Sequence, residues 1–424
     1  MKSLKVILNP CKSPGILSIK LWIREGSRAD PFKKKGIHYL LSTLLTRGCG
    51  PYNSTTIADV VEGNGAVLLS ETYEDGIMIS MKCMTKSSSY LLPILKWMII
   101  EPLIEVNHMN LERKLLIQTI NRNKENSFHI AFNQWKKISY GNHPYSHDIL
   151  GVSEDLKGIT REDLLELSKM LRSRKKVLVA SGSLPNNILD EFSNISKDSL
   201  STNKNYSNNY IKPLIKKSSN NDSIIYNFEN TGQIIILLGT TTIPHSHEND
   251  LILRLLNCHL GIGMSSVLFK MLREKNGLAY DVGIYHPIRE YEAPFLIHAS
   301  TTKEKGLTTL KILIECWLNT LKNKISHDEL ELAKAKYRGN MAHNSQTISQ
   351  KADRKAHLLG INMYEDHDIN SLLKINQITR EDIIEIANLY LKSPKISLSG
   401  PQSSIEKLKE YWINYFINNK TSIY

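Results

Sequence analysis

The chain has 424 residues, of which 41% are hydrophobic and 23% are charged. This composition is typical of a soluble globular protein and excludes fibrous and disordered classes, while the length is too great for one ordinary core and predicts at least two domains. The formal charge of +12 is spread over Lys-rich and Asn-rich stretches, with no dense basic block and no nucleic-acid motif, so nucleic acid is not an expected partner.

The sequence also bears on the compartment. The five cysteines share no C-x-x-C spacing, which favours reduced thiols. Residues 1–10 lack the apolar core and the cleavage site of a signal peptide. The most apolar stretch, residues 91–106, contains Lys96, Glu101 and two prolines and falls short of a membrane span. We therefore expect a cytoplasmic protein without a membrane span.

Strand and helix patterns are mixed along the chain. Residues 15–24 and 232–240 are rich in β-branched residues and predict strands. Apolar residues recur at helical spacing in 40–45, in 111–120 and again in 251–256. Because the two patterns do not alternate strictly, they favour the α+β class, with helices packed on a largely antiparallel sheet.

An internal repeat indicates a duplicated fold. ITREDLLEL begins at Ile159 and ITREDIIEI begins at Ile378, and each copy starts with a threonine and an aspartate that can cap a helix. The same spacing relates HMNLERKL, which begins at His108, to HDELELAK, which begins at His327. Each half of the chain is therefore predicted to be a copy of one sheet-and-helix domain.

The linker between the copies is predicted from composition. Residues 197–223 are rich in Asn, Ser and Lys and contain too few apolar side chains to form a core. The predicted domains are therefore 1–196 and 224–424, with 197–223 as the linker.

A helix near the amino terminus carries a family resemblance. GIHYLLSTLLTRG, residues 36–48, is similar to the signature helix of the inverzincin metallopeptidases, the superfamily of insulinase and the mitochondrial processing peptidase. In that family H-x-x-E-H places two zinc-binding histidines on one face of a helix, with a glutamate that takes a proton from the metal-bound water. Here His38 matches the first histidine, but Leu41 and Ser42 stand at the glutamate and second histidine positions.

The third zinc ligand of the family is also replaced. The family places a glutamate on a later helix, and the similar run ERKLLIQTI, residues 112–120, puts Thr119 at that position. A lone histidine binds zinc weakly. We therefore expect no metal on this chain and interpret His38 as a hydrogen-bonded, partly buried histidine.

Other histidines do not form a convincing metal site. His245, His247, Asp250 and His259 are close in sequence, but they follow Pro244, where a loop is expected between a strand and a helix. His143 and His147 flank a proline in a sequence similar to the family's G-x-H-P-Y loop and are interpreted as structural.

The second half keeps a further family segment. HLGIGMSSVLFKMLREKNGLAYDVG, residues 259–283, resembles the family segment that supplies an arginine and a tyrosine to hold the substrate backbone and steady the oxyanion. Arg273 and Tyr280 match those two residues. Gly261 and Gly263 match part of a glycine-rich loop that handles substrate in the mitochondrial relatives, in a shortened form.

The resemblance implies a clam-like half of a peptidase chamber. We expect a non-catalytic subunit that is inactive alone and supplies Arg273 and Tyr280 to a homologous partner, which carries the zinc and cuts unfolded peptide. Two alternatives remain open at this point: a non-enzymatic scaffold subunit, and an active zinc peptidase with displaced ligands.

Overall fold

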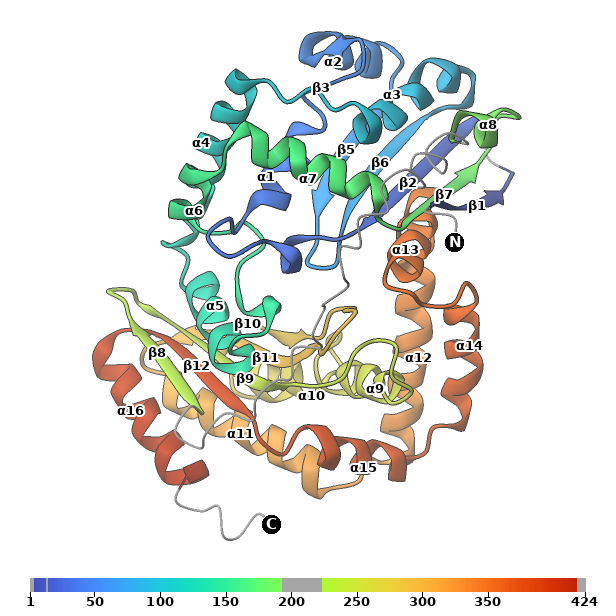
Figure 1. Ribbon diagram of the computed structural model, residues 1–424. Helices are drawn as coiled ribbons and strands as arrows, with labels where there is room; N and C mark the ends of the chain where they lie inside the picture. The colour runs from blue at the N-terminus through green and yellow to red at the C-terminus, as the bar shows by residue number, and fades with distance from the viewer. Residues whose placement is uncertain (1–3, 13, 193–222, 418–424) are drawn as a thin grey trace. The chain divides into compact units, whose positions relative to one another are not determined.

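The computed structural model describes residues 4–12, 14–192 and 223–417 (Figure 1). The chain divides into two compact units. The first takes its described residues from Met1–Asn121, His147–Lys212 and Ala342–His367, and the second takes its own from Arg122–Ser146, Pro213–Met341 and Asp368–Tyr424. All but the last residue of the predicted linker, 197–223, lies outside the described residues.

The first unit is built on a five-stranded sheet. Its order is β1-β7-β2-β6-β5, and only the β1–β7 pair is parallel. The strands are β1 Leu4–Pro10, β2 Ile16–Arg24, β5 Val67–Thr72, β6 Gly76–Met84 and β7 Lys176–Gly182, with a short hairpin of β3 Gly48–Cys49 and β4 Tyr52–Asn53. Its helices are α1 Ile37–Leu44, α2 Ser54–Gly63, α3 Ser88–Ile100, α4 Val106–Asn123, α6 Ser153–Gly158, α7 Arg161–Ser173, α8 Ile188–Phe192 and α13 Ile348–Gly360.

The second unit repeats this sheet. Its order is β8-β12-β9-β11-β10, and again only the outer β8–β12 pair is parallel. The strands are β8 Ile224–Phe228, β9 Gln233–Thr241, β10 Ala279–Tyr285, β11 Pro294–Thr302 and β12 Lys395–Gly400. The helices are α5 Ser127–Tyr140, α9 Asp250–Leu260, α10 Val267–Phe269, η7 Lys270–Glu274, α11 Gly306–Lys322, α12 His327–His343, α14 His367–Lys374, α15 Arg380–Tyr390 and α16 Gln402–Trp412.

The repeated sequences occupy equivalent elements. ITREDLLEL and ITREDIIEI form α7 and α15, and each helix starts with a complete capping box, Thr160 with Asp163 and Thr379 with Asp382. Each of these helices leads into the strand next to the outer one, β7 in the first sheet and β12 in the second. The prediction of a duplicated α+β fold is therefore confirmed.

Each sheet is covered on both faces, which explains its nearly continuous apolar strands. In β9, Ile234, Ile236 and Leu238 belong to the main core of the second unit, whereas Ile235 and Leu237 pack with Trp135 of α5 on the opposite face. In the first unit, α13 packs on β2 and β7.

The two covering helices are exchanged between the halves of the sequence. Helix α5 comes from the first half and covers the second sheet, and α13 comes from the second half and covers the first. Trp22 of β2 stacks on His357 of α13 with ring centroids 4.8 Å apart, and a Cβ at Gly360 would lie 2.3 Å from the Trp22 ring. The predicted bounds 1–196 and 224–424 follow the two sheets but do not include this exchange. Among the described helices, none is long and apolar enough to cross a membrane.

Candidate functional site

The segment before α1 fixes the residue that matches the first zinc histidine. Gly36 has φ +98°, and a Cβ there would lie 2.6 Å from the Leu150 carbonyl oxygen, so glycine is required. Its N–H donates to Asp30 Oδ2 at 2.6 Å, and the N–H of His38 donates to Asp30 Oδ1 at 3.3 Å. Asp30 therefore holds the first turn of α1 and gives it a negative charge where the helix dipole favours one.

The His38 ring is fully buried between two carboxylates. Its Nδ1–H donates to Asp30 Oδ1 at 2.6 Å, and its Nε2 lies 3.8 Å from Glu25 Oε1. Burial alone would lower the pKa of His38, but the hydrogen bond to Asp30 and the nearby Glu25 carboxylate outweigh it and raise the pKa above its usual value. The expectation of partial burial is thus corrected: the exposed fraction of His38 is 0%.

The other three zinc-type positions do not provide ligands. Leu41 is fully buried in the core of the first unit. The Ser42 hydroxyl bonds to the Ser70 hydroxyl at 2.7 Å, and the Thr119 hydroxyl donates to the Leu115 carbonyl at 2.9 Å within α4. The residues at these positions therefore do not fit a zinc ion. Within the described part of the chain, no group of three or more His, Cys, Asp or Glu could hold a metal.

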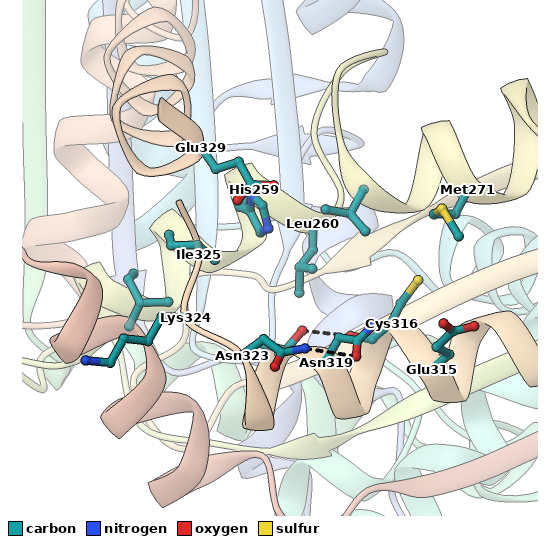
Figure 2. Close-up of a pocket in the computed structure, with 13 residues that line it drawn as sticks. His259, Leu260, Met271, Glu315, Cys316, Asn319, Asn323, Lys324, Ile325 and Glu329 are labelled. Carbon is teal, nitrogen blue, oxygen red and sulfur yellow. Dashed lines mark hydrogen bonds between the residues drawn. The ribbon is translucent and has the colours of Figure 1, made fainter. Parts of the chain in front are cut away.

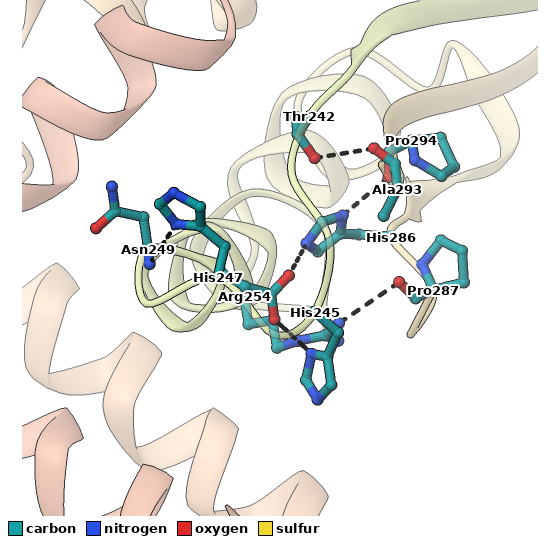
Figure 3. Close-up of polar contacts among 10 residues, drawn as sticks. Thr242, His245, His247, Asn249, Arg254, His286, Pro287, Ala293 and Pro294 are labelled. Carbon is teal, nitrogen blue, oxygen red and sulfur yellow. Dashed lines mark hydrogen bonds and ion pairs between the residues drawn. The ribbon is translucent and has the colours of Figure 1, made fainter. Parts of the chain in front are cut away.

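A buried polar cluster forms where a loop was predicted (Figure 3). His245 lies in that loop, but Asp250 begins α9. Asp250 Oδ2 accepts from Arg254 Nε and from His245 Nδ1, both at 2.6 Å, and Oδ1 lies 3.2 Å from Nε2 of His286 at the end of β10. Burial would raise the pKa of Asp250, but Arg254, His245 and His286 together lower it well below its usual value.

The side chains of the remaining histidines of the sequence analysis are not part of this cluster. His247 Nδ1 accepts from the Asn249 N–H at 3.2 Å, and His259 lies at the end of α9 beside a cavity. His143 belongs to the second unit and accepts from the Tyr145 N–H at 3.1 Å, whereas His147 belongs to the first unit and bonds to the Ser27 carbonyl at 2.8 Å.

Arg273 and Tyr280 both stand at backbone irregularities. Arg273 lies in η7, a π-helical turn, and its guanidinium sits 5.2 Å from the Phe269 ring centroid. Tyr280 lies in a β-bulge, because the β10–β11 register shifts between Ala279 and Asp281, and its exposed fraction is 71%. Such irregularities are often found at functional sites, where they redirect a side chain.

The strands around Tyr280 contain a contact that sequence reasoning missed. Gly283 of β10 pairs with His298 of β11, and a Cβ at Gly283 would lie 2.8 Å from His298 Nε2. His298 Nδ1 lies 3.2 Å from Asp281 Oδ2, and Phe128 packs edge-on against the His298 ring. Because Gly283 has no Cβ, the His298 ring can lie across β10 next to the bulge. This pairing appears only once the strand register is known.

The two glycines of the shortened loop have different roles. A Cβ at Gly261 would lie 2.9 Å from the Ile284 side chain, so Gly261 permits close packing against β10. Gly263 has φ +77° and open space around it, so its role is conformational.

Comparison with known proteins identifies the family. Residues 7–153 match the family model described as insulinase, peptidase family M16, and residues 158–337 match that of the peptidase M16 inactive domain. The chain belongs to the M16 peptidase family. It is 26% identical to the uncharacterized zinc protease YmxG of Bacillus subtilis over 92% of this chain and 96% of that protein, and 24% identical to an uncharacterized zinc protease of Rickettsia felis over 91% and 92%.

Solved structures agree with the fold of this M16 chain. An M16 inactive domain from Pseudomonas fluorescens superposes with a TM-score of 0.82 at 20% identity, covering 94% of this chain and 96% of that one. A protease from Helicobacter pylori gives a TM-score of 0.82 at 19% identity, covering 94% and 98%. The M16 chain described here thus has the family fold with a first-unit helix whose side chains do not suit zinc.

Proposed function

We propose that this chain is the non-catalytic subunit of a heterodimeric zinc metallopeptidase. A homologous partner would carry the zinc, and Arg273 and Tyr280 of this chain would bind substrate in trans. The observation that carries the proposal is the placement of both residues at backbone irregularities within one family-like segment, with the Tyr280 side chain exposed. Side chains held in this way are available to a peptide without first breaking contacts in the core.

The chemistry of the two residues suits a peptide substrate. The Arg273 guanidinium carries a planar set of N–H donors that can bind a substrate carbonyl. The Tyr280 hydroxyl can donate to an oxygen on which negative charge develops in the transition state. Neither role needs a metal on this chain, and an unfolded peptide is the substrate that presents its backbone for such contacts.

The environment of His38 supports the non-catalytic assignment. Its ring is enclosed by Asp30 and Glu25, and the side chains at the remaining zinc-type positions are apolar or already hydrogen-bonded. The proposal keeps the cytoplasm as its location, supported by five free cysteines.

A scaffold role is the second candidate because of one relative. Over 168 residues, 39% of this chain and 35% of that protein, the chain is 24% identical to bovine cytochrome b-c1 complex subunit 1. Under this reading the chain would support an assembly without touching a substrate, and Arg273 and Tyr280 would have no effect on peptide cleavage.

Zinc content and co-expression test the proposal. The purified chain is expected to contain almost no zinc and to cleave no unfolded peptide, whereas co-expression with a homologous H-x-x-E-H chain from the same genome gives activity. In that pair, Arg273→Ala and Tyr280→Phe are expected to lower kcat about 100-fold or more. The exposed control variants Lys275→Ala and Tyr364→Phe leave it unchanged.

Other outcomes point to the alternatives. About one zinc per chain, with activity that is lost in His38→Ala or His259→Ala, would establish displaced ligands. Stable association only with membrane-complex subunits, and no change on substituting Arg273 or Tyr280, would establish the scaffold role.

A further inference from the structure

A cavity of about 220 Å³ lies among the helices of the second unit (Figure 2). It is bounded by the end of α9, the segment from α10 into η7, the last turns of α11 and the start of α12. An apolar cavity of about 150 Å³ can hold benzene, so this volume accommodates one ring with a short chain. It is smaller than a typical site for a drug-sized ligand, which measures about 300 Å³ or more.

The floor of the cavity is apolar. Leu260, Cys316, Ile325 and Ile383 are buried around it, and the half-buried Met271 adds a flexible thioether. Leu260 points from α9 into the middle of the cavity (Figure 2). A surface of this kind favours an apolar arm of a ligand.

The mouth carries polar groups that accept hydrogen bonds. Glu315, Asn319, Asn323, Glu329 and His259 line it. The Asn323 Nδ2 amide donates to Asn319 Oδ1 at 3.2 Å, which fixes both amides. His259 and Glu329 lie on the same side of the cavity and point toward one another (Figure 2).

The His259 and Glu329 side of the cavity offers one carboxylate and one neutral imidazole at neutral pH. The Ser326 N–H donates to Glu329 Oε2 at 2.8 Å, and this hydrogen bond is the main reason why the pKa of Glu329 lies below its usual value. Burial lowers the pKa of His259, although the nearby Glu329 opposes the effect. At neutral pH Glu329 is thus a carboxylate and His259 a neutral imidazole with one nitrogen able to accept.

Three lysines lie near the cavity, and one of them, Lys270, lowers the pKa of Glu329 as well as that of His259. Lys324 lines the cavity, but its ammonium bonds to Glu381 at 2.9 Å. Lys336 and Lys270 lower the pKa of His259 without lining the cavity, and Lys336 donates to the Cys258 carbonyl at 3.3 Å. The carboxyl-terminal ends of α9 and α11 meet the cavity and favour positive charge, whereas the amino-terminal end of α12 favours negative charge and holds Glu329 in its first turn.

We propose that this cavity binds a primary ammonium group that carries a short apolar or aromatic arm. The ammonium donates its three N–H groups to Glu329, His259 and the amide oxygens at the mouth, while the arm packs on Leu260, Met271 and Cys316. The same chemistry is offered by a free amine and by the amino terminus of a peptide that begins with an aromatic residue. This site is separate from Arg273 and Tyr280 and does not depend on the function proposed for them.

Ligand-observed NMR with the full chain tests the proposal. Phenethylammonium is the probe, and 2-phenylethanol and phenylacetate are the neutral and anionic controls with the same ring. Phenethylammonium is expected to bind about five-fold more tightly than 2-phenylethanol, as an ion pair near the surface allows, and phenylacetate is expected to bind most weakly. A Phe-initiated peptide with a free or an acetylated amino terminus distinguishes the two sources: binding that acetylation abolishes indicates a peptide, and binding of phenethylammonium alone indicates a free amine.

A matched pair of variants locates the site. Glu329→Gln keeps an acceptor for the Ser326 N–H and removes the charge, and it should remove the preference for phenethylammonium over 2-phenylethanol. Asp328→Asn removes an exposed carboxylate one residue away, outside the cavity lining, and should leave the preference intact. Equal binding of the three small molecules to the wild-type chain, or equal preferences in the two variants, would overturn the proposal.

Discussion

At the scale of single residues, His38 shows how an imidazole can stabilise two buried carboxylates. The ring lies between Asp30 and Glu25, and Glu25 is paired in turn with Arg174. Burial opposes the charge on Glu25, but its contacts with His38 and Arg174 hold the pKa of Glu25 below its usual value. The group is therefore an internally neutralised set of charges, which tolerates burial better than any member alone.

The raised pKa of His38 predicts a pH-dependent stability. Because the folded pKa lies above the usual 6.5, the stabilisation is complete below about pH 6.5 and is lost as the pH rises through the folded value. His38→Gln should cost about 3 kcal/mol of unfolding free energy at pH 6 and should flatten the dependence between pH 6 and 8. Urea unfolding at several pH values measures both effects, with the exposed His327→Gln as control. An unchanged pH profile in His38→Gln would contradict the assignment.

At the scale of elements, the sequence predicts features that depend on near neighbours. The capping boxes of α7 and α15 join residues three positions apart, so the letters ITRED were sufficient to predict them. The burial of His38 was underestimated because Glu25 and Arg174 are brought to it by different elements. The Asp250 cluster was missed for the same reason, since His286 is supplied by the end of a strand that follows 36 residues later.

The Asp250 cluster joins three elements and predicts a second stability effect. Asp250 connects the start of α9 to the preceding loop and to the end of β10. Because its folded pKa lies well below 3.8, its contribution is complete above pH 3.8 and is lost as the pH falls through the folded value. Asp250→Asn should therefore lower the free energy of unfolding by about 3 kcal/mol. The loss should be similar at pH 7 and at pH 5, because both lie above the pKa of Asp250 in the folded and the unfolded chain.

Urea midpoints for wild type and Asp250→Asn at both pH values provide the measurement. The exposed Asp366→Asn is the control and should change the unfolding free energy by less than about 0.5 kcal/mol. A cost for Asp250→Asn as small as that of the control would mean that the cluster adds nothing to stability.

At the scale of the whole molecule, the exchanged helices make each half of the sequence incomplete. Residues 224–424 lack α5, whose Trp135 and Ala131 bury Ile235, Leu237 and Leu296 on one face of the second sheet. Residues 1–196 lack α13, which packs on β2 and β7 and brings His357 against Trp22. Neither dependence follows from composition or periodicity, because the helices are as amphipathic as their neighbours and only the tertiary structure shows which sheet they cover.

This exchange predicts that the halves do not fold when they are produced separately. A fragment of residues 224–424 would expose the apolar face that α5 covers, and exposed faces of that kind lead to aggregation. It is expected to bind a hydrophobic dye and to elute as aggregates in size-exclusion chromatography, whereas co-expression with residues 1–196 should restore a soluble complex. Trp135→Ala in the full chain should lower the free energy of unfolding by about 3 kcal/mol or more, because it leaves a cavity between α5 and the second sheet. A soluble, cooperatively unfolding monomer of residues 224–424 alone would show that α5 is dispensable and that the two halves are independent domains after all.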